Sequence, residues 1–101
     1  MEKMRPHYLL ADLQRVIEER GINALTATAV KGAAALGLSG EEAVLVVLGL
    51  KQRNFFKSMT TLADHKIWQD VYHAAVKAGS VAYIKLTLRE NGAVVIQFKE
   101  K

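Results

Sequence analysis

The chain has 101 residues, of which 50% are hydrophobic and 24% charged, and it contains no cysteine. This length and balance predict one ordered domain over residues 1–101 and argue against a disordered chain. The lack of cysteine excludes disulfides, thiolate nucleophiles and zinc sites built on sulfur, and it fits a reducing compartment. We expect neither a signal peptide nor a membrane span, and therefore a cytoplasmic protein.

The net charge of +4 is unevenly distributed along the chain. Residues 1–50 carry five Lys or Arg against six Asp or Glu, a balance of −1, whereas residues 51–101 carry nine against four, a balance of +5. A basic half favours an anionic partner, of which nucleic acid is the commonest. Charge alone leaves open a basic surface that only aids solubility.

The first half of the chain predicts helices. Apolar residues recur at helical spacing from Leu9 until Gly21 ends the pattern. Thr26 is expected to cap a second helix, which Gly37 ends and whose small residues allow close packing.

A third helix is predicted by the spacing of Ser39 and Glu42, which is that of a capping box. This helix is expected to run to about Leu50. Because positions 43–48 are all apolar, we expect it to be buried on most sides.

After Lys51 the residues become β-branched and aromatic in short runs, which predicts strands. Helices followed by antiparallel strands, without alternation of the two, are typical of an α+β domain. The expected strands cover residues 55–61, 67–73, 81–89 and 93–99.

The last two predicted strands also indicate their own register. Both carry apolar residues at even positions, so paired residue numbers must sum to an even number if these residues share the core face. A two-residue turn would give an odd sum. A three-residue loop with Gly92 in the left-handed conformation gives an even one.

This register places Tyr83 opposite Lys99 on the outer surface of the sheet, beside Lys85 and Gln97. Cleaving RNA without a metal requires a base for the 2′-hydroxyl, cations for the phosphate and a proton for the departing 5′-oxygen. Lys, Tyr and Gln can share these tasks. The outer face is therefore a candidate site, although an isolated lysine is more often a solvated surface residue.

Four blocks of sequence point to a known family. The chain opens on Met1, Glu2 and Lys3 with Pro6 and His7, continues through FFKSMTT at 55–61 and ADHKIWQDVYH at 63–73, and closes on FKEK at 98–101. In order and spacing these blocks resemble the MqsR family of mRNA interferases, type II toxins. The resemblance implies a RelE-like α+β fold and cleavage of mRNA at GC-containing triplets. It also implies that no metal or cofactor is needed and that a cognate MqsA-like antitoxin neutralises the toxin.

Carried over by position, the resemblance implies four catalytic residues: Lys57, Gln69, Tyr83 and Lys99. Two of them, Tyr83 and Lys99, are also paired by the register argument. Lys57 and Lys99 would stabilise the phosphate, and one of them would serve as base. Gln69 would hold an oxygen and Tyr83 would supply or orient a proton.

Weaker candidates for RNA contact are Lys85, His65 and His73. Asp64 and Asp70, together with the two histidines, form the one cluster that could suggest a metal. Asp70 and His73 should point to opposite faces of a strand, so we expect no metal site.

The sequence departs from the family pattern at two positions, where Phe56 replaces a usual Tyr and Leu62 replaces an aromatic residue or His. The first change removes a hydroxyl, and the second weakens a possible stacking surface. Trp68 is expected to lie in the core.

Two alternatives to an enzyme stay open, a non-catalytic RNA-binding module and a protein-binding domain that offers a sheet edge.

Overall fold

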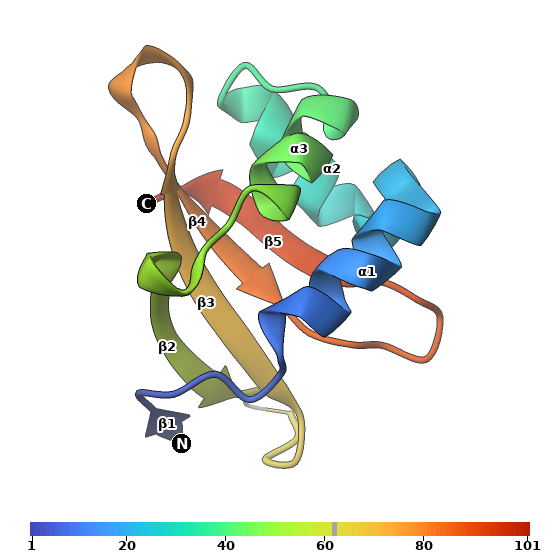
Figure 1. Cartoon of the computed structure of the whole chain (residues 1–101), viewed down its shortest axis with the longest axis vertical. Helices are drawn as coiled ribbons and strands as arrows, with labels where there is room; N and C mark the ends of the chain where they lie inside the picture. The colour runs from blue at the N-terminus through green and yellow to red at the C-terminus, as the bar shows by residue number, and fades with distance from the viewer. Residues whose placement is uncertain (62) are drawn as a thin grey trace.

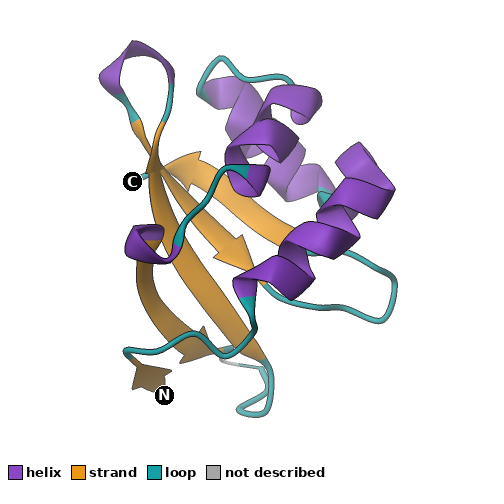
Figure 2. Ribbon diagram, viewed as in Figure 1, coloured by secondary structure: helices purple, strands orange, loops and turns teal. Residues whose placement is uncertain are grey.

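The computed structural model describes residues 1–61 and 63–101. In these residues three α-helices precede the main strands, and the strands form one antiparallel sheet in the order β1-β2-β3-β4-β5. Figures 1 and 2 show the helices gathered on one side of the sheet. The α+β prediction is confirmed. The helices are Leu10–Arg20 (α1), Ala27–Ala35 (α2) and Gly40–Leu48 (α3), and the strands are Glu2–Lys3 (β1), Phe55–Thr60 (β2), Trp68–Ala75 (β3), Val81–Leu86 (β4) and Val95–Glu100 (β5).

The predicted helix signals occur where the sequence placed them. Gly21 follows α1 with a φ of 56°, a left-handed conformation that suits glycine. The Thr26 hydroxyl accepts a hydrogen bond from the Ala29 backbone N–H at 3.1 Å. Ser39 and Glu42 form both hydrogen bonds of a capping box at the start of α3. Local capping chemistry therefore defines the ends of these helices.

Two apolar side chains predicted to be buried are exposed. Leu45 is 68% exposed, whereas Ala43, Val44 and Val47 are buried and Val46 and Leu48 pack against the core. Leu88 is 47% exposed because the pairing of β4 with β5 ends at Leu86. The prediction that α3 is buried on most sides fails at Leu45 alone, whereas the prediction that the apolar stripe of β4 reaches Leu88 is wrong.

The register of the final hairpin is confirmed at the site. Tyr83 pairs with Lys99, and Gly92 has the left-handed φ of 83° expected for the loop. The register then shifts by one residue, so that Leu86 lies opposite Val95 and both strands are shorter than predicted. The other predicted strands agree within two residues, and β1 was not predicted.

Helix α2 lies directly against the backbone of β5. Thr26 donates from its N–H to the Val95 carbonyl at 3.0 Å and from its hydroxyl to the Ile96 carbonyl at 3.1 Å. A Cβ atom built on Gly32 would lie 1.7 Å from the carbonyl oxygen of Phe98. The expectation of close packing is confirmed, and this contact fixes the strand that carries Lys99.

The core lies between the helices and the covered face of the sheet. Tyr72, Ile84 and Phe98 are wholly buried there, with Leu13 and Ile17 of α1. In the described residues we find no helix that is both long and apolar enough to span a membrane. The odd-numbered side chains of β3 and β4, and Gln97 and Lys99 of β5, point away from the helices, toward the open face.

Candidate active site

The open face of the sheet carries the predicted site residues in three rows. The middle row, which we term the cation row, contains Lys57, Val71, Lys85 and Gln97. These residues lie side by side because the register pairs Lys57 with Val71, Val71 with Lys85 and Lys85 with Gln97. Two lysines predicted from different parts of the sequence thus flank one buried valine.

A second row lies on each side of the cation row. Residues two apart along a strand are separated by about 6.6 Å, so the neighbouring rows are within reach of the same ligand. The aromatic row contains Phe56, His73, Tyr83 and Lys99, and the Gln69 row contains Glu2, Met59 and Gln69. The four predicted catalytic residues are therefore brought onto one face.

Lys57 is not a free lysine. Its Nζ donates to the Glu2 carboxylate at 2.7 Å, and its side chain is only 22% exposed. The hydrogen bond to Glu2 raises the pKa of Lys57, and the same bond lowers the pKa of Glu2. Both groups are therefore charged at neutral pH, which suits Lys57 to stabilising a phosphate and not to accepting a proton.

Glu2 was not singled out as a site residue from the sequence. It lies on the two-residue strand β1, which pairs Glu2 with Met59. The signal was its place in the opening block that resembles the MqsR family, next to Lys3. A strand of two residues has no alternation by which periodicity could reveal it.

Lys85 occupies the centre of the positive charge. Burial lowers its pKa, and the neighbouring cations Lys99 and Lys57 lower it further. In the part of the chain described here, no carboxylate forms an ion pair with Lys85 or Lys99. Lys85 therefore lies at the centre of the positive charge on the open face, a position that attracts anions.

Tyr83 lies between two of these cations. The Nζ atom of Lys99 is 5.2 Å from the centre of the Tyr83 ring, and that of Lys85 is 5.9 Å away. Cations at this distance are attracted to the face of an aromatic ring. The Tyr83 ring therefore lies in contact with both cations.

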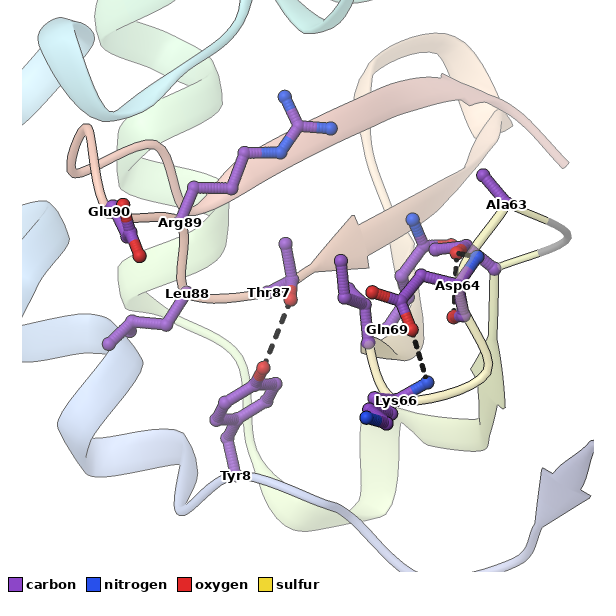
Figure 3. A pocket seen from close by; sticks show the side chains of 11 residues that line it. Tyr8, Ala63, Asp64, Lys66, Gln69, Thr87, Leu88, Arg89 and Glu90 are labelled. Carbon is purple, nitrogen blue, oxygen red and sulfur yellow. Dashed lines mark hydrogen bonds between the residues drawn. The ribbon is translucent and has the colours of Figure 1, made fainter.

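Gln69 lines two adjoining clefts at the opposite end of the face. One cleft, of about 490 Å³, also contains Glu2 and Lys85. The other, of about 610 Å³, is shown in Figure 3, where the Tyr8 and Thr87 hydroxyls are joined by a hydrogen bond of 3.1 Å. The Gln69 amide can therefore reach a ligand that extends from the cation row into either cleft.

The two weaker histidine candidates are separated. His73 belongs to the aromatic row, whereas His65 is exposed in the turn before β3 and lines none of the clefts described here. Leu62, the second departure from the family pattern, lies outside the described residues. The geometry therefore favours His73 over His65 as a ligand contact.

Asp70 points to the covered side and is wholly buried. Its carboxylate accepts hydrogen bonds from the backbone N–H groups of His7 and Tyr8 at 2.9 to 3.0 Å and from the Ser58 hydroxyl at 2.6 Å. Asp70 and His73 do lie on opposite faces. Among the described residues no group of three His, Asp or Glu side chains is placed to hold a metal ion.

The same N-terminal segment covers Trp68. The His7 ring stacks on Trp68 with 5.5 Å between ring centres, and the Lys3 Nζ lies 4.1 Å from the centre of the indole. Trp68 is half-buried under these residues, so its expected place in the core is only partly met. The contacts of His7 and Lys3 with Trp68 fix the N-terminal segment, and with it the position of Glu2 beside Lys57.

Fold and site together define a small α+β protein whose open sheet face gathers lysines and a tyrosine around space for an anion. The family model described as "Motility quorum-sensing regulator, toxin of MqsA" matches residues 5–100. The mRNA interferase toxin MqsR of Escherichia coli (strain K12) is 38% identical over 101 residues, which is 100% of each chain. The chain belongs to the MqsR toxin family.

Proposed function

We propose that this protein is the toxin of a type II toxin–antitoxin system and acts as a metal-independent endoribonuclease on mRNA. The observation that carries the proposal is the cation row beside the Tyr83–Lys99 pair on the open face. Family membership supports it, because the Escherichia coli relative is named an mRNA interferase toxin. We infer that the protein works in the cytoplasm, where mRNA is found.

In the proposed reaction the 2′-oxygen of one nucleotide attacks the adjoining phosphorus and the bond to the 5′-oxygen breaks. Lys57 and Lys99 stabilise the added negative charge on the phosphate, and Gln69 holds an oxygen. Tyr83 gives a proton to the departing 5′-oxygen. The products are a 2′,3′-cyclic phosphate and a 5′-hydroxyl.

The proton of the 2′-hydroxyl needs a base in this scheme. Lys57 is kept charged by Glu2, so we assign the base to one of the two lysines without an ion pair among the described residues, Lys85 and Lys99. Burial and neighbouring cations favour the neutral form of Lys85. The Lys85 amine can also hold the phosphate while it is charged.

Two finer features are part of the proposal. We infer cleavage at GC-containing triplets, as the resemblance to the MqsR family implies. We also infer that an MqsA-like antitoxin neutralises the protein, since the matching family is described as the toxin of MqsA. An RNA library of random sequence, cut by the protein and sequenced at the new 5′ ends, tests the triplet preference.

The central test is incubation of the purified protein with RNA in the presence of EDTA. We expect fragments that end in a 2′,3′-cyclic phosphate, which mass spectrometry identifies. Intact RNA, or cutting that requires added metal, would contradict the proposal. Lys57→Ala should abolish cutting while leaving the fold unchanged by circular dichroism.

The cation row supports one second function, that of an RNA-binding module without catalysis. Lysines that contact phosphates release bound counterions, so such a module would bind RNA more weakly as salt increases. Binding that falls with salt, without any product after prolonged incubation, would favour this function over cleavage.

A further inference from the structure

Strand β2 contains a bulge that changes the direction of one side chain. Phe55 pairs with Tyr72 and Lys57 pairs with Val71, so Phe56 is an extra residue between them. Without the bulge, Phe56 and Lys57 would point to opposite faces of the sheet. With it, the two consecutive side chains share the open face, an aromatic ring beside a cation.

The Phe56 ring lies on a second ring. Its centre is 4.4 Å from that of His73, and the two planes make an angle of 25°, which is a stacked pair. The His73 ring is in turn 5.6 Å from that of Tyr83. Three rings from three strands therefore form one continuous aromatic surface beside the cation row.

This aromatic surface lies outside the core. Phe56 is 41% exposed. A phenylalanine normally stabilises a fold by being buried, so the exposure of this ring has no structural benefit. A cleft of about 410 Å³ opens over the surface, with Lys99 and Lys101 at its margin. Burial lowers the pKa of His73, and Lys101 lowers it further, so the imidazole is neutral at pH 7 and stacks as an uncharged ring.

We propose that Phe56 and His73 form a stacking subsite for one unpaired nucleobase of the bound RNA, next to the phosphate held by the cation row. The ligand is single-stranded because the bases of a duplex are already stacked on one another. The assignment of RNA as ligand depends on the proposed function, whereas the stacking geometry does not. Any base can occupy such a subsite, because every base has an aromatic face.

The position of the subsite relates it to the point of cleavage. The aromatic row is about 6.6 Å from the cation row, two residues along the strand. Tyr83 belongs to the aromatic row and Lys85 to the cation row, so a base stacked on Phe56 keeps its own phosphate beside both residues. The subsite therefore binds a nucleotide adjacent to the scissile phosphate and sets where the strand lies.

The test measures binding without chemistry. The probe is a short single-stranded 2′-fluoro RNA, labelled with a fluorophore, which lacks the hydroxyl that would attack the phosphate. Fluorescence anisotropy gives its dissociation constant for the wild-type protein and for Phe56→Leu, which keeps an apolar side chain but removes the ring. We expect Phe56→Leu to bind about 10-fold more weakly, equivalent to about 1.4 kcal/mol. Phe56→Trp is the matched control and should bind at least as well as the wild type.

A second arm identifies the base. Probes in which one nucleotide at a time is abasic should show one position that weakens wild-type binding about 10-fold and has little effect in Phe56→Leu, because the ring and the base act as a pair. Equal binding by wild type and Phe56→Leu, or an abasic effect that Phe56→Leu leaves unchanged, would overturn the subsite. His73→Leu provides the same comparison if Phe56→Leu does not fold, as judged by circular dichroism.

The outcomes also separate the subsite from the proposed function. Base-dependent binding to the uncleavable probe, together with intact natural RNA, would support the subsite and contradict the ribonuclease. Cleavage of natural RNA at the same rate and KM by wild type and Phe56→Leu would support the ribonuclease and contradict the subsite.

Discussion

Asp70 of β3 and Lys85 of β4 lie on neighbouring strands, one residue out of register, and their charges have opposite surroundings. On the covered side, Asp70 is wholly buried and accepts hydrogen bonds from His7, Tyr8 and Ser58. On the open side, Lys85 has other cations as its charged neighbours. A buried charge whose hydrogen bonds are all supplied by the protein stabilises the fold. Charges of one sign that lie together on an open face are instead typical of a ligand-binding site.

The largest effect that would test this contrast is expected at Asp70. Both carboxylate oxygens receive N–H donors, so the NH₂ group of Asp70→Asn meets a donor whichever way the amide turns. Since hydrogen bonds to a charged group contribute about 1.5–3 kcal/mol each, we expect the free energy of unfolding to fall by about 3 kcal/mol. Urea denaturation measures the free energy of unfolding. Asp12→Asn on the exposed face of α1 is the control, and an equal loss of stability in both variants would refute the structural role of Asp70.

Lys85→Met should show the reverse pattern. It removes a half-buried cation from beside Lys57 and Lys99, so we expect about 100-fold slower RNA cleavage, which corresponds to about 2.7 kcal/mol. The free energy of unfolding should be unchanged or slightly higher, because repulsion is relieved. Single-turnover cleavage and urea denaturation measure the two quantities. If the variant cuts RNA normally, the open face does not depend on its central charge.

Gly32→Ala tests how firmly the covered face supports the open one. The new methyl group would meet the Phe98 carbonyl, so α2 must move away from β5. Overpacking of this kind costs about 1–3 kcal/mol, of which the better helix propensity of alanine recovers about 1 kcal/mol. We expect a net loss of about 2 kcal/mol in urea denaturation. Ala35→Gly, also in α2, is the control for propensity, and equal stability of Gly32→Ala and wild type would show that the contact is not tight.

The smallest effect is expected at Glu2 and concerns pH. As the pH rises through the raised pKa of Lys57, that cation is lost and cleavage should slow; as the pH falls through the lowered pKa of Glu2, the ion pair is lost. Glu2→Gln removes the carboxylate that raises the pKa of Lys57. The alkaline limb of kcat/KM against pH should therefore move to lower pH. Glu19→Gln on α1 has the same change of charge and should leave the limb in place; an unmoved limb in Glu2→Gln would separate Glu2 from the site.

Much of the fold follows from local chemistry in the sequence. Caps at Thr26 and Ser39 define two helix starts, and the even positions of β4 and β5 were enough to pair Tyr83 with Lys99. Exposure of Leu45 and Leu88 could not be predicted, because it depends on how far neighbouring elements extend. The α+β class and the pairing of two of the four proposed catalytic residues could therefore be predicted from the sequence alone.

The features that were missed depend on contacts between distant residues. Neighbours of Asp70 in its strand face both sides of the sheet, so the sequence does not show which side it faces. Only the structure shows that backbone N–H groups of His7 and Tyr8 donate hydrogen bonds to its carboxylate. The bulge at Phe56 is hidden because consecutive aromatic residues resemble an ordinary strand. Glu2 reaches Lys57 from 55 residues away, a pairing for which the residues themselves carry no local pattern.

The contact between α2 and β5 has a consequence for self-association. A sheet grows into fibres or swapped dimers when an edge strand offers free backbone groups to another chain. At β5, the carbonyls of Val95 and Ile96 already accept hydrogen bonds from Thr26, and Gly32 lies against the carbonyl of Phe98. In the part of the chain described here, an added strand is left with the opposite edge of the sheet, which consists of the short β1 and of residues 55–57 of β2 that β1 does not cover.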